Sequence, residues 1–215
     1  MKQPSIEEII ELIKSHNIEF KAAKTVLDLM VKCQNVILQK KQITVFENKI
    51  SQLKFYCFLS TSFLDLLCVF KSIKQSTLEW EKIHFSKTAY LLIYEIIKNY
   101  DSNKKLIFLE IQKSFPKLIP LYNKNSELLA DFKKDFDYDG KIKFVRHKSS
   151  GHIDKDFLNY YKAISSIEFD ECLVAVENCI GFLKLTMMIL HDLTLGTTED
   201  EISNPHDPNK EYWAI

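Results

Sequence analysis

The segment from Thr44 to Ile73 contains neither glycine nor proline, and it is apolar nearly all round between Phe55 and Phe70. An uninterrupted apolar run of this length predicts a long helix that is buried on most of its sides. No stretch of the chain alternates apolar and polar residues for long enough to require a strand, and no repeat of fixed period is present. The sequence therefore predicts an all-α fold, an antiparallel bundle of about six to eight helices with this helix at its centre.

Helices are also expected on both sides of the central one. Ser5 and Glu8 have the spacing of a capping box, so a short helix is predicted from there to about Ser15, followed by a second over 18–40. Residues 1–42 are accordingly treated as an N-terminal helical extension of a bundle over 43–195.

A second capping box, at Ser76 and Glu79, predicts a helix that ends near Tyr100, where the polar residues 101–103 are expected to break it. Further helices are expected over 106–115, 126–136, 154–167 and 169–193, with Pro116 and Pro120 as stops and a turn at 137–140. Residues 196–215 carry a net charge of −4 with two prolines, which predicts a loose acidic tail.

The composition excludes several classes of protein. Only four glycines occur, so the glycine-rich phosphate loops of Rossmann and P-loop enzymes cannot be built. Lys and Arg together number 29, as do Asp and Glu, and this zero net charge argues against a dedicated DNA-coating protein. A local basic patch remains possible.

The cysteines and the apolar segments predict a cytoplasmic location. The five cysteines form no C-x-x-C pair and stand among apolar residues, which is typical of buried, reduced thiols. The N-terminus has a helical charge pattern instead of the pattern of a signal peptide. The most apolar stretches, 55–70 and 179–190, contain Asp65 and Lys184 and are expected to be too short to span a bilayer, so no membrane passage is predicted.

Neither a metal nor another cofactor is expected. Asp135, Asp137, Asp139 and Gly140 match the opening of a calcium loop, but the twelfth position of that loop is Arg146, a cation where a carboxylate is needed. A polar turn that ends a helix is the favoured interpretation. The six histidines show no H-x-x-x-H pair, so no zinc site is predicted.

Arg146 is the only arginine among 29 basic residues. Its guanidinium can grip a phosphate with two hydrogen bonds, and His152, six residues later, can give and take a proton near neutral pH. Cleavage of RNA without a metal needs both: a group that moves protons at the 2′-hydroxyl and the leaving oxygen, and a cation that stabilises the phosphorane. Ser149, Ser150 and Gly151 can break a helix between the two and let them converge, or the two can meet across a dimer axis.

This segment resembles the Arg-x(4–6)-His signature of the HEPN superfamily. The match consists of Arg146, His152 and the polar His147 directly after the arginine, within helical surroundings over roughly 44–195. The resemblance implies an all-α domain that forms a homodimer with a composite site, and a metal-independent endoribonuclease of the kind found in toxin–antitoxin, abortive-infection and other prokaryotic defence systems. Such enzymes leave 2′,3′-cyclic phosphate ends.

The resemblance also implies roles for individual residues. Arg146 would hold the scissile phosphate, His152 would act as general acid or base, and His147 would orient either partner. Asp65 and Glu95, each in an apolar helix, are candidates for a supporting acid from an upstream helix; the alternative for both is an ordinary solvent-facing carboxylate. Residues 103–148 carry a net charge of +5, and Lys143 and Lys148 are the candidate RNA contacts beside the motif.

A second interpretation stays open. A HEPN-like domain can lack catalytic activity and act as a helical interaction or regulatory module that binds a protein partner, because fold alone does not fix function. An antitoxin is a possible partner under either interpretation.

Overall fold

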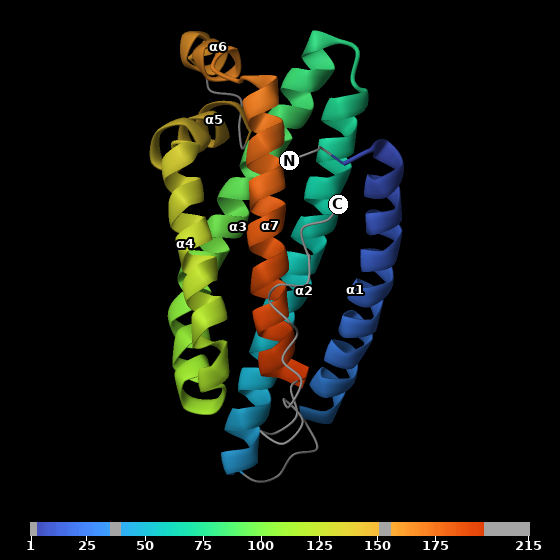
Figure 1. The fold of residues 1–215 in the computed structure, drawn as a ribbon, viewed down its shortest axis with the longest axis vertical. Coiled ribbons are helices and arrows are strands. Elements are labelled where there is room, and N and C mark those ends of the chain that lie inside the picture. The colour runs from blue at the N-terminus through green and yellow to red at the C-terminus, as the bar shows by residue number, and fades with distance from the viewer. Residues whose placement is uncertain (1–3, 35–39, 151–155, 196–215) are drawn as a thin grey trace. The chain divides into compact units, whose positions relative to one another are not determined.

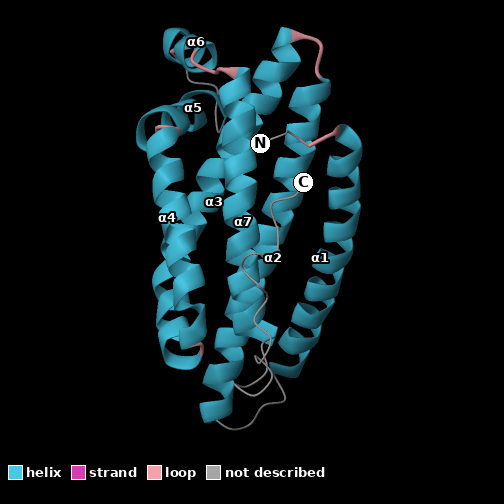
Figure 2. Ribbon diagram, viewed as in Figure 1, coloured by secondary structure: helices cyan, strands magenta, loops and turns pink. Residues whose placement is uncertain are grey.

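The computed structural model describes residues 4–34, 40–150 and 156–195, and within these ranges the chain forms seven α-helices and no strand (Figures 1 and 2). The helices are α1 (Ile6–Gln34), α2 (Lys40–Gln75), α3 (Glu79–Ser114), α4 (Ile119–Asp135), α5 (Lys143–Val145), α6 (Phe157–Ser165) and α7 (Phe169–Leu195). Three short helical turns of other types complete the order: η1 (Pro116–Leu118), η2 (Tyr138–Ile142) and η3 (Arg146–Ser150). The prediction of an all-α bundle of six to eight helices is confirmed.

The first helix, α1, is continuous where the sequence predicted two helices. Its capping box is formed as expected: the Ser5 amide donates to Glu8 Oε2 at 2.6 Å, and the Glu8 amide donates to Ser5 Oγ at 3.2 Å. The break expected after residue 15 does not occur. His16 is buried in the middle of the helix, with one ring nitrogen 3.1 Å from Ser60 Oγ of α2 and the other 3.1 Å from Glu19 Oε2. The contacts with Ser60 and Glu19 stabilise the helix in a segment that is weak in apolar residues.

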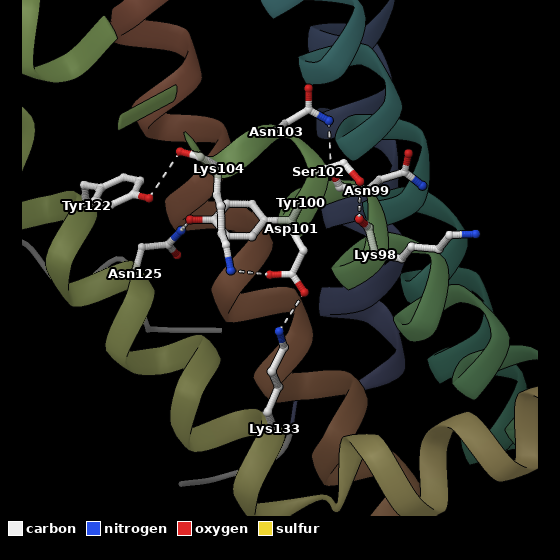
Figure 3. Close-up of polar contacts among 10 residues, drawn as sticks. All are labelled: Lys98, Asn99, Tyr100, Asp101, Ser102, Asn103, Lys104, Tyr122, Asn125 and Lys133. Carbon is white, nitrogen blue, oxygen red and sulfur yellow. Dashed lines mark hydrogen bonds and ion pairs between the residues drawn. The ribbon is translucent and has the colours of Figure 1, made fainter. Parts of the chain in front are cut away.

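The third helix, α3, is also longer than predicted, because the polar residues expected to break it bond within it. Ser102 Oγ donates to the Lys98 carbonyl at 3.0 Å, and Asn103 Nδ2 donates to the Asn99 carbonyl at 2.8 Å (Figure 3). Bonds of this kind, from a short polar side chain to the preceding turn, leave the helical backbone intact. The predicted break at residues 101–103 is therefore wrong.

The starts of α3 and α4 differ from their predicted positions. The N-cap position of α3 is occupied by Leu78, whose side chain makes no capping bond, so the capping box predicted at Ser76 is not formed. Pro120 lies in the first turn of α4, where the missing amide hydrogen of proline costs nothing. The sequence predicts a stop at Pro120, and α4 therefore begins earlier than predicted.

Asp101 connects α3 with α4. Its Oδ1 accepts a hydrogen bond from Lys104 at 2.8 Å, and its Oδ2 accepts one from Lys133 of α4 at 2.7 Å (Figure 3). Beside it, Asn125 of α4 donates to the Tyr100 hydroxyl at 3.4 Å. Burial by itself would raise the pKa of Asp101, but the hydrogen bonds from the two lysines outweigh it and hold the pKa below its ordinary value.

Asp101 should therefore make stability depend on pH. Because its pKa is lower in the folded chain than in the unfolded one, the carboxylate stabilises the fold above about pH 4, and this contribution is lost as the pH falls through the folded-state value. We expect Asp101→Asn to lower the free energy of unfolding at neutral pH by up to about 1 kcal/mol, since both lysines are partly exposed. Urea unfolding at about pH 7 and about pH 2.5 measures this. The difference between wild type and variant should shrink in acid; an equal difference at both values would contradict the assignment.

The chain divides into two compact units, residues 1–61 with 186–215 and residues 62–185. The core of the second unit includes the contact between Tyr100 of α3 and Phe182 of α7, whose rings meet edge to face with centroids 4.9 Å apart. Cys172 of α7 is buried against α3, with its Sγ 4.0 Å from the Ser86 carbonyl. The predicted boundary between residues 1–42 and 43–195 is not the boundary between these two units, and it stays a prediction. The predicted acidic tail lies outside the described residues.

Two helices meet the length and composition criteria for a membrane span. The qualifying stretches are Phe46–Gln75, with a mean hydropathy of 1.6, and Phe169–Thr194, with 1.8. The expectation that the apolar stretches are too short for a bilayer is therefore not met. In each stretch 67% of the apolar window is buried inside the protein, as in a core helix of a soluble protein. The absence of membrane passage remains a prediction.

The cysteines follow the prediction only in part. Cys172 and Cys179 are buried, whereas Cys57 is half-buried and Cys33 and Cys68 are exposed. Burial raises the pKa of Cys172 to about 12 and also raises that of Cys179, so both are neutral thiols at physiological pH. All five cysteines are free.

Candidate functional site

Arg146 comes directly after a buried segment of the second unit. Ile142 and Val145 are fully buried and fix the α5 segment against α3. Arg146 then opens η3, whose backbone turns are of the wide π type, and Ser149 Oγ donates to the Val145 carbonyl at 2.8 Å. Single π turns are rare and are frequent at functional sites, so the backbone itself marks the arginine segment as unusual.

Glu95 of α3 forms an ion pair with Arg146. The distance from Nη2 to Glu95 Oε1 is 3.0 Å, and the two side chains are 25% and 34% exposed. The neighbouring ring of Tyr94 lies against the guanidinium, with Cζ 5.0 Å from the ring centroid. The Nε of Arg146 is buried and has no hydrogen-bond partner among the described residues. A carboxylate and an aromatic ring thus orient the guanidinium at the edge of the unit.

His147 lies beside the guanidinium and is exposed. Its Nδ1 is 3.3 Å from Arg146 Nη1, and its ring meets Tyr94 edge to face with centroids 5.5 Å apart. Because a guanidinium can only donate, this hydrogen bond requires a neutral imidazole with its proton on Nε2. The contact therefore leaves an Nε2–H group on an exposed ring directly next to Arg146.

Two tyrosines that the sequence analysis did not single out support this arrangement. Tyr94 and Tyr138 are stacked with centroids 6.1 Å apart, and the Tyr138 hydroxyl donates to the Tyr94 carbonyl at 3.5 Å. Burial raises the pKa of Tyr138. Lys133 and Lys143 place their ammonium groups 5.4 and 5.3 Å from the Tyr138 ring centroid. The only signal in the sequence was the position of Tyr94 directly before Glu95.

The two candidate RNA-binding lysines flank Arg146 along the chain. Lys143, in α5, forms an ion pair with Asp139, and this hydrogen bond raises the pKa of Lys143. Lys148, in η3, is partly exposed. Lys143 and Lys148 therefore belong to α5 and η3, the two short elements that position Arg146.

Of the two remaining candidates, only Asp65 lies among the described residues. His152 lies outside the described residues. Asp65 is exposed on α2, where partial desolvation raises its pKa, and no contact among the described residues joins it to Arg146. Of the two supporting acids that the sequence left open, the fold thus places Glu95, and not Asp65, on the arginine.

The segment that resembles a calcium loop forms a capped turn, as the favoured interpretation predicted. Asp137 adopts a left-handed backbone with φ of 43°, and its carboxylate accepts hydrogen bonds from the amides of Gly140 at 3.2 Å and Lys141 at 3.1 Å. A Cβ on Gly140 would lie 2.3 Å from an Asp137 carboxylate oxygen, so a larger residue at this position would displace the capping carboxylate. Within the described ranges, no group of three or more His, Cys, Asp or Glu side chains is placed to hold a metal ion.

Comparisons with known proteins returned no relative. No family model matches the chain, and neither the curated proteins nor the solved structures gave a match. The resemblance to the HEPN superfamily therefore depends on the sequence motif alone.

Proposed function

We propose that this protein is a metal-independent endoribonuclease of HEPN type, active in a prokaryotic defence or toxin–antitoxin system. The observation that carries the proposal is the surroundings of Arg146: the guanidinium is oriented by Glu95 and Tyr94 and has the imidazole of His147 beside it. Arg146 is the residue that the sequence motif assigns to the scissile phosphate.

In the proposed reaction a base removes the proton of the ribose 2′-hydroxyl, and the 2′-oxygen forms a bond to phosphorus. The bond from phosphorus to the 5′-oxygen breaks, and an acid protonates that oxygen. The products are a 2′,3′-cyclic phosphate and a free 5′-hydroxyl, and no metal or redox partner is consumed. Arg146 stabilises the additional negative charge on the phosphorane, and His152 moves the protons.

The contacts of Arg146 are compatible with this role. One hydrogen bond of Nη2 goes to Glu95 and one of Nη1 goes to His147, and each of these nitrogens carries a second N–H group. Lys143 and Lys148 supply positive charge on either side of the arginine for the phosphates that flank the scissile bond. In the proposed assembly two copies form a homodimer with a composite site in the cytoplasm, and an antitoxin or another protein partner can bind it.

A non-catalytic interaction module is the second candidate. The observation that favours it is the ion pair between Glu95 and Arg146, because the pair gives the arginine a structural role that needs no RNA. Under this interpretation a protein partner binds the domain, and substitutions of the motif leave that association unchanged.

The test is incubation of the purified protein with total RNA and with tRNA in excess EDTA, followed by mapping of the cleaved ends. We expect cleavage with cyclic phosphate ends by the wild type, and a loss of at least about 10²-fold for Arg146→Ala and His152→Ala, which remove a transition-state cation and a proton-transfer group. Lys105→Ala, which removes an exposed cation elsewhere on α3, is the matched control and should cleave normally. Intact RNA with all four folded proteins would reject the enzyme and favour the interaction module.

A further inference from the structure

Helix α6 carries two exposed aromatic rings that do not belong to its buried contacts. Phe157 is 66% exposed and Tyr161 is 56% exposed, and their rings are stacked one helical turn apart, with centroids separated by 5.9 Å. The buried contacts of α6 come instead from Ala163 and Ile164. Two large rings are therefore held in a fixed relation on the surface, where their exposure is a cost to solubility unless they bind something.

These rings lie in the same part of the second unit as the arginine segment. Helix α6 packs on η3, which contains Arg146, and on α5. Figure 1 shows α5 and α6 together at one end of that unit. The ring of Tyr160, between the two exposed rings in the sequence, is 6.3 Å from Phe157. The exposed face of α6 and Arg146 are thus carried by directly contacting elements.

Two lysines lie against aromatic rings that neighbour Phe157 and Tyr161. The ammonium group of Lys87, on α3, lies 5.4 Å from the ring centroid of Tyr160 and 3.3 Å from its hydroxyl. Lys162, on α6 itself, lies 6.0 Å from the ring of Phe144 in α5. The nearby Asp156 accepts from the Leu158 amide and so caps α6 instead of forming a separate acidic patch. Aromatic faces for bases next to cations for phosphates are the usual elements of a single-strand binding surface.

We propose that Phe157 and Tyr161 form a stacking surface for bases of single-stranded RNA whose backbone passes Arg146. This inference rests on the proposed function, and it names the substrate class: unpaired RNA, because a base can stack on a protein ring only when it has left its own helix. Stacking depends little on base identity, so the surface selects single strands and not a sequence. The surface favours RNA over a protein partner because both of the side chains that form it are aromatic, and because Lys87 and Lys162 lie against the nearby rings of Tyr160 and Phe144.

The test measures binding separately from cleavage. The probe is a fluorescein-labelled 12-mer of 2′-O-methyl RNA, which lacks the attacking hydroxyl and cannot be cut, and the readout is fluorescence anisotropy with the full chain. Because stacking of one base on one ring is worth about 1–3 kcal/mol, Phe157→Ala and Tyr161→Ala should each weaken binding by roughly 5- to 100-fold. Tyr161→Phe keeps the ring and should bind like the wild type. Leu158→Ala is the matched control, since Leu158 is 76% exposed on the same helix but has no ring.

The outcomes separate this inference from the proposed function. Normal binding by both ring variants overturns the stacking surface, even if the wild type cleaves RNA. Equal weakening by Leu158→Ala also overturns it, because the face would then be a general apolar contact. A change of oligomeric state in the ring variants, measured by light scattering, would assign the face to a second copy and reject RNA. Ring-dependent binding by a wild-type protein that cuts no RNA would reject the nuclease and support the stacking surface.

Discussion

Arg146→Lys is expected to lower the rate of RNA cleavage by about 10²- to 10³-fold. This is the usual effect of removing one preorganised hydrogen-bond donor from the negative charge that develops in the transition state. Lysine keeps the positive charge and can still form an ion pair with Glu95, but it offers a point charge where the guanidinium offers a planar fork. Lysine also loses the fixed relation to the ring of Tyr94, whose centroid is 5.0 Å from the guanidinium carbon. The measurement is the single-turnover cleavage rate in EDTA, with folding checked by circular dichroism.

Glu95→Gln distinguishes a catalytic arginine from a structural one. The ion pair is partly exposed, so its loss should cost no more than about 1 kcal/mol of stability. If Arg146 serves only that pair, Arg146→Lys will keep the pair and most of its stability, Glu95→Gln will lose it, and cleavage will be indifferent to both. If Arg146 stabilises the reacting phosphate, Arg146→Lys will lower the rate far more than it lowers stability. Full activity of Arg146→Lys would contradict the proposed role.

The apolar pattern was sufficient to predict the class of fold, because long runs without a breaker leave a helix as the only regular structure. Apolar helical periodicity also placed α2 and α7 to within a few residues of their observed bounds. The apolar pattern did not predict that α1 and α3 continue through their polar segments. At residue 16 and at residues 101–103 the sequence shows side chains that favour helix ends, whereas in the folded chain those side chains bond to Ser60, to the preceding turn and to lysines. A contact distant in sequence decided residue 16, and bonds within the helix together with the ion pair to Lys133 decided residues 101–103.

The candidate site, too, could be predicted from the sequence only in part. Arg146 was recognisable as the only arginine, and Glu95 as an acid in an apolar helix, but no spacing rule connects residues 51 positions apart. Choosing Glu95 over Asp65 required the packing of α3 against α5 and η3. Tyr94 and Tyr138 were missed because tyrosines in a helical sequence are ordinary core residues until their neighbours are known. The paired rings and the π turns depend on tertiary structure, which a single sequence does not display.

Phe182→Ala is expected to lower the free energy of unfolding by about 3–5 kcal/mol, the usual cost of truncating a buried phenylalanine. Phe182 is 2% exposed, and its ring meets Tyr100 edge to face at an interplanar angle of 84°. The variant therefore loses both the transfer of the ring out of water and the aromatic contact, and it leaves a cavity between α3 and α7. Urea unfolding followed by circular dichroism at 222 nm measures the change.

Phe157→Ala is the matched control for this prediction, because it removes the same side chain from an exposed position of α6. It should change the stability by less than about 0.5 kcal/mol. Phe182→Leu, which retains most of the buried volume, should lie between the two alanine variants. This order follows because truncation costs free energy mainly through lost burial, and of the two phenylalanines only Phe182 is buried. Equal stabilities of Phe182→Ala and Phe157→Ala would mean that α3 and α7 do not pack around this ring in solution, and the core of the second unit would have to be reassigned.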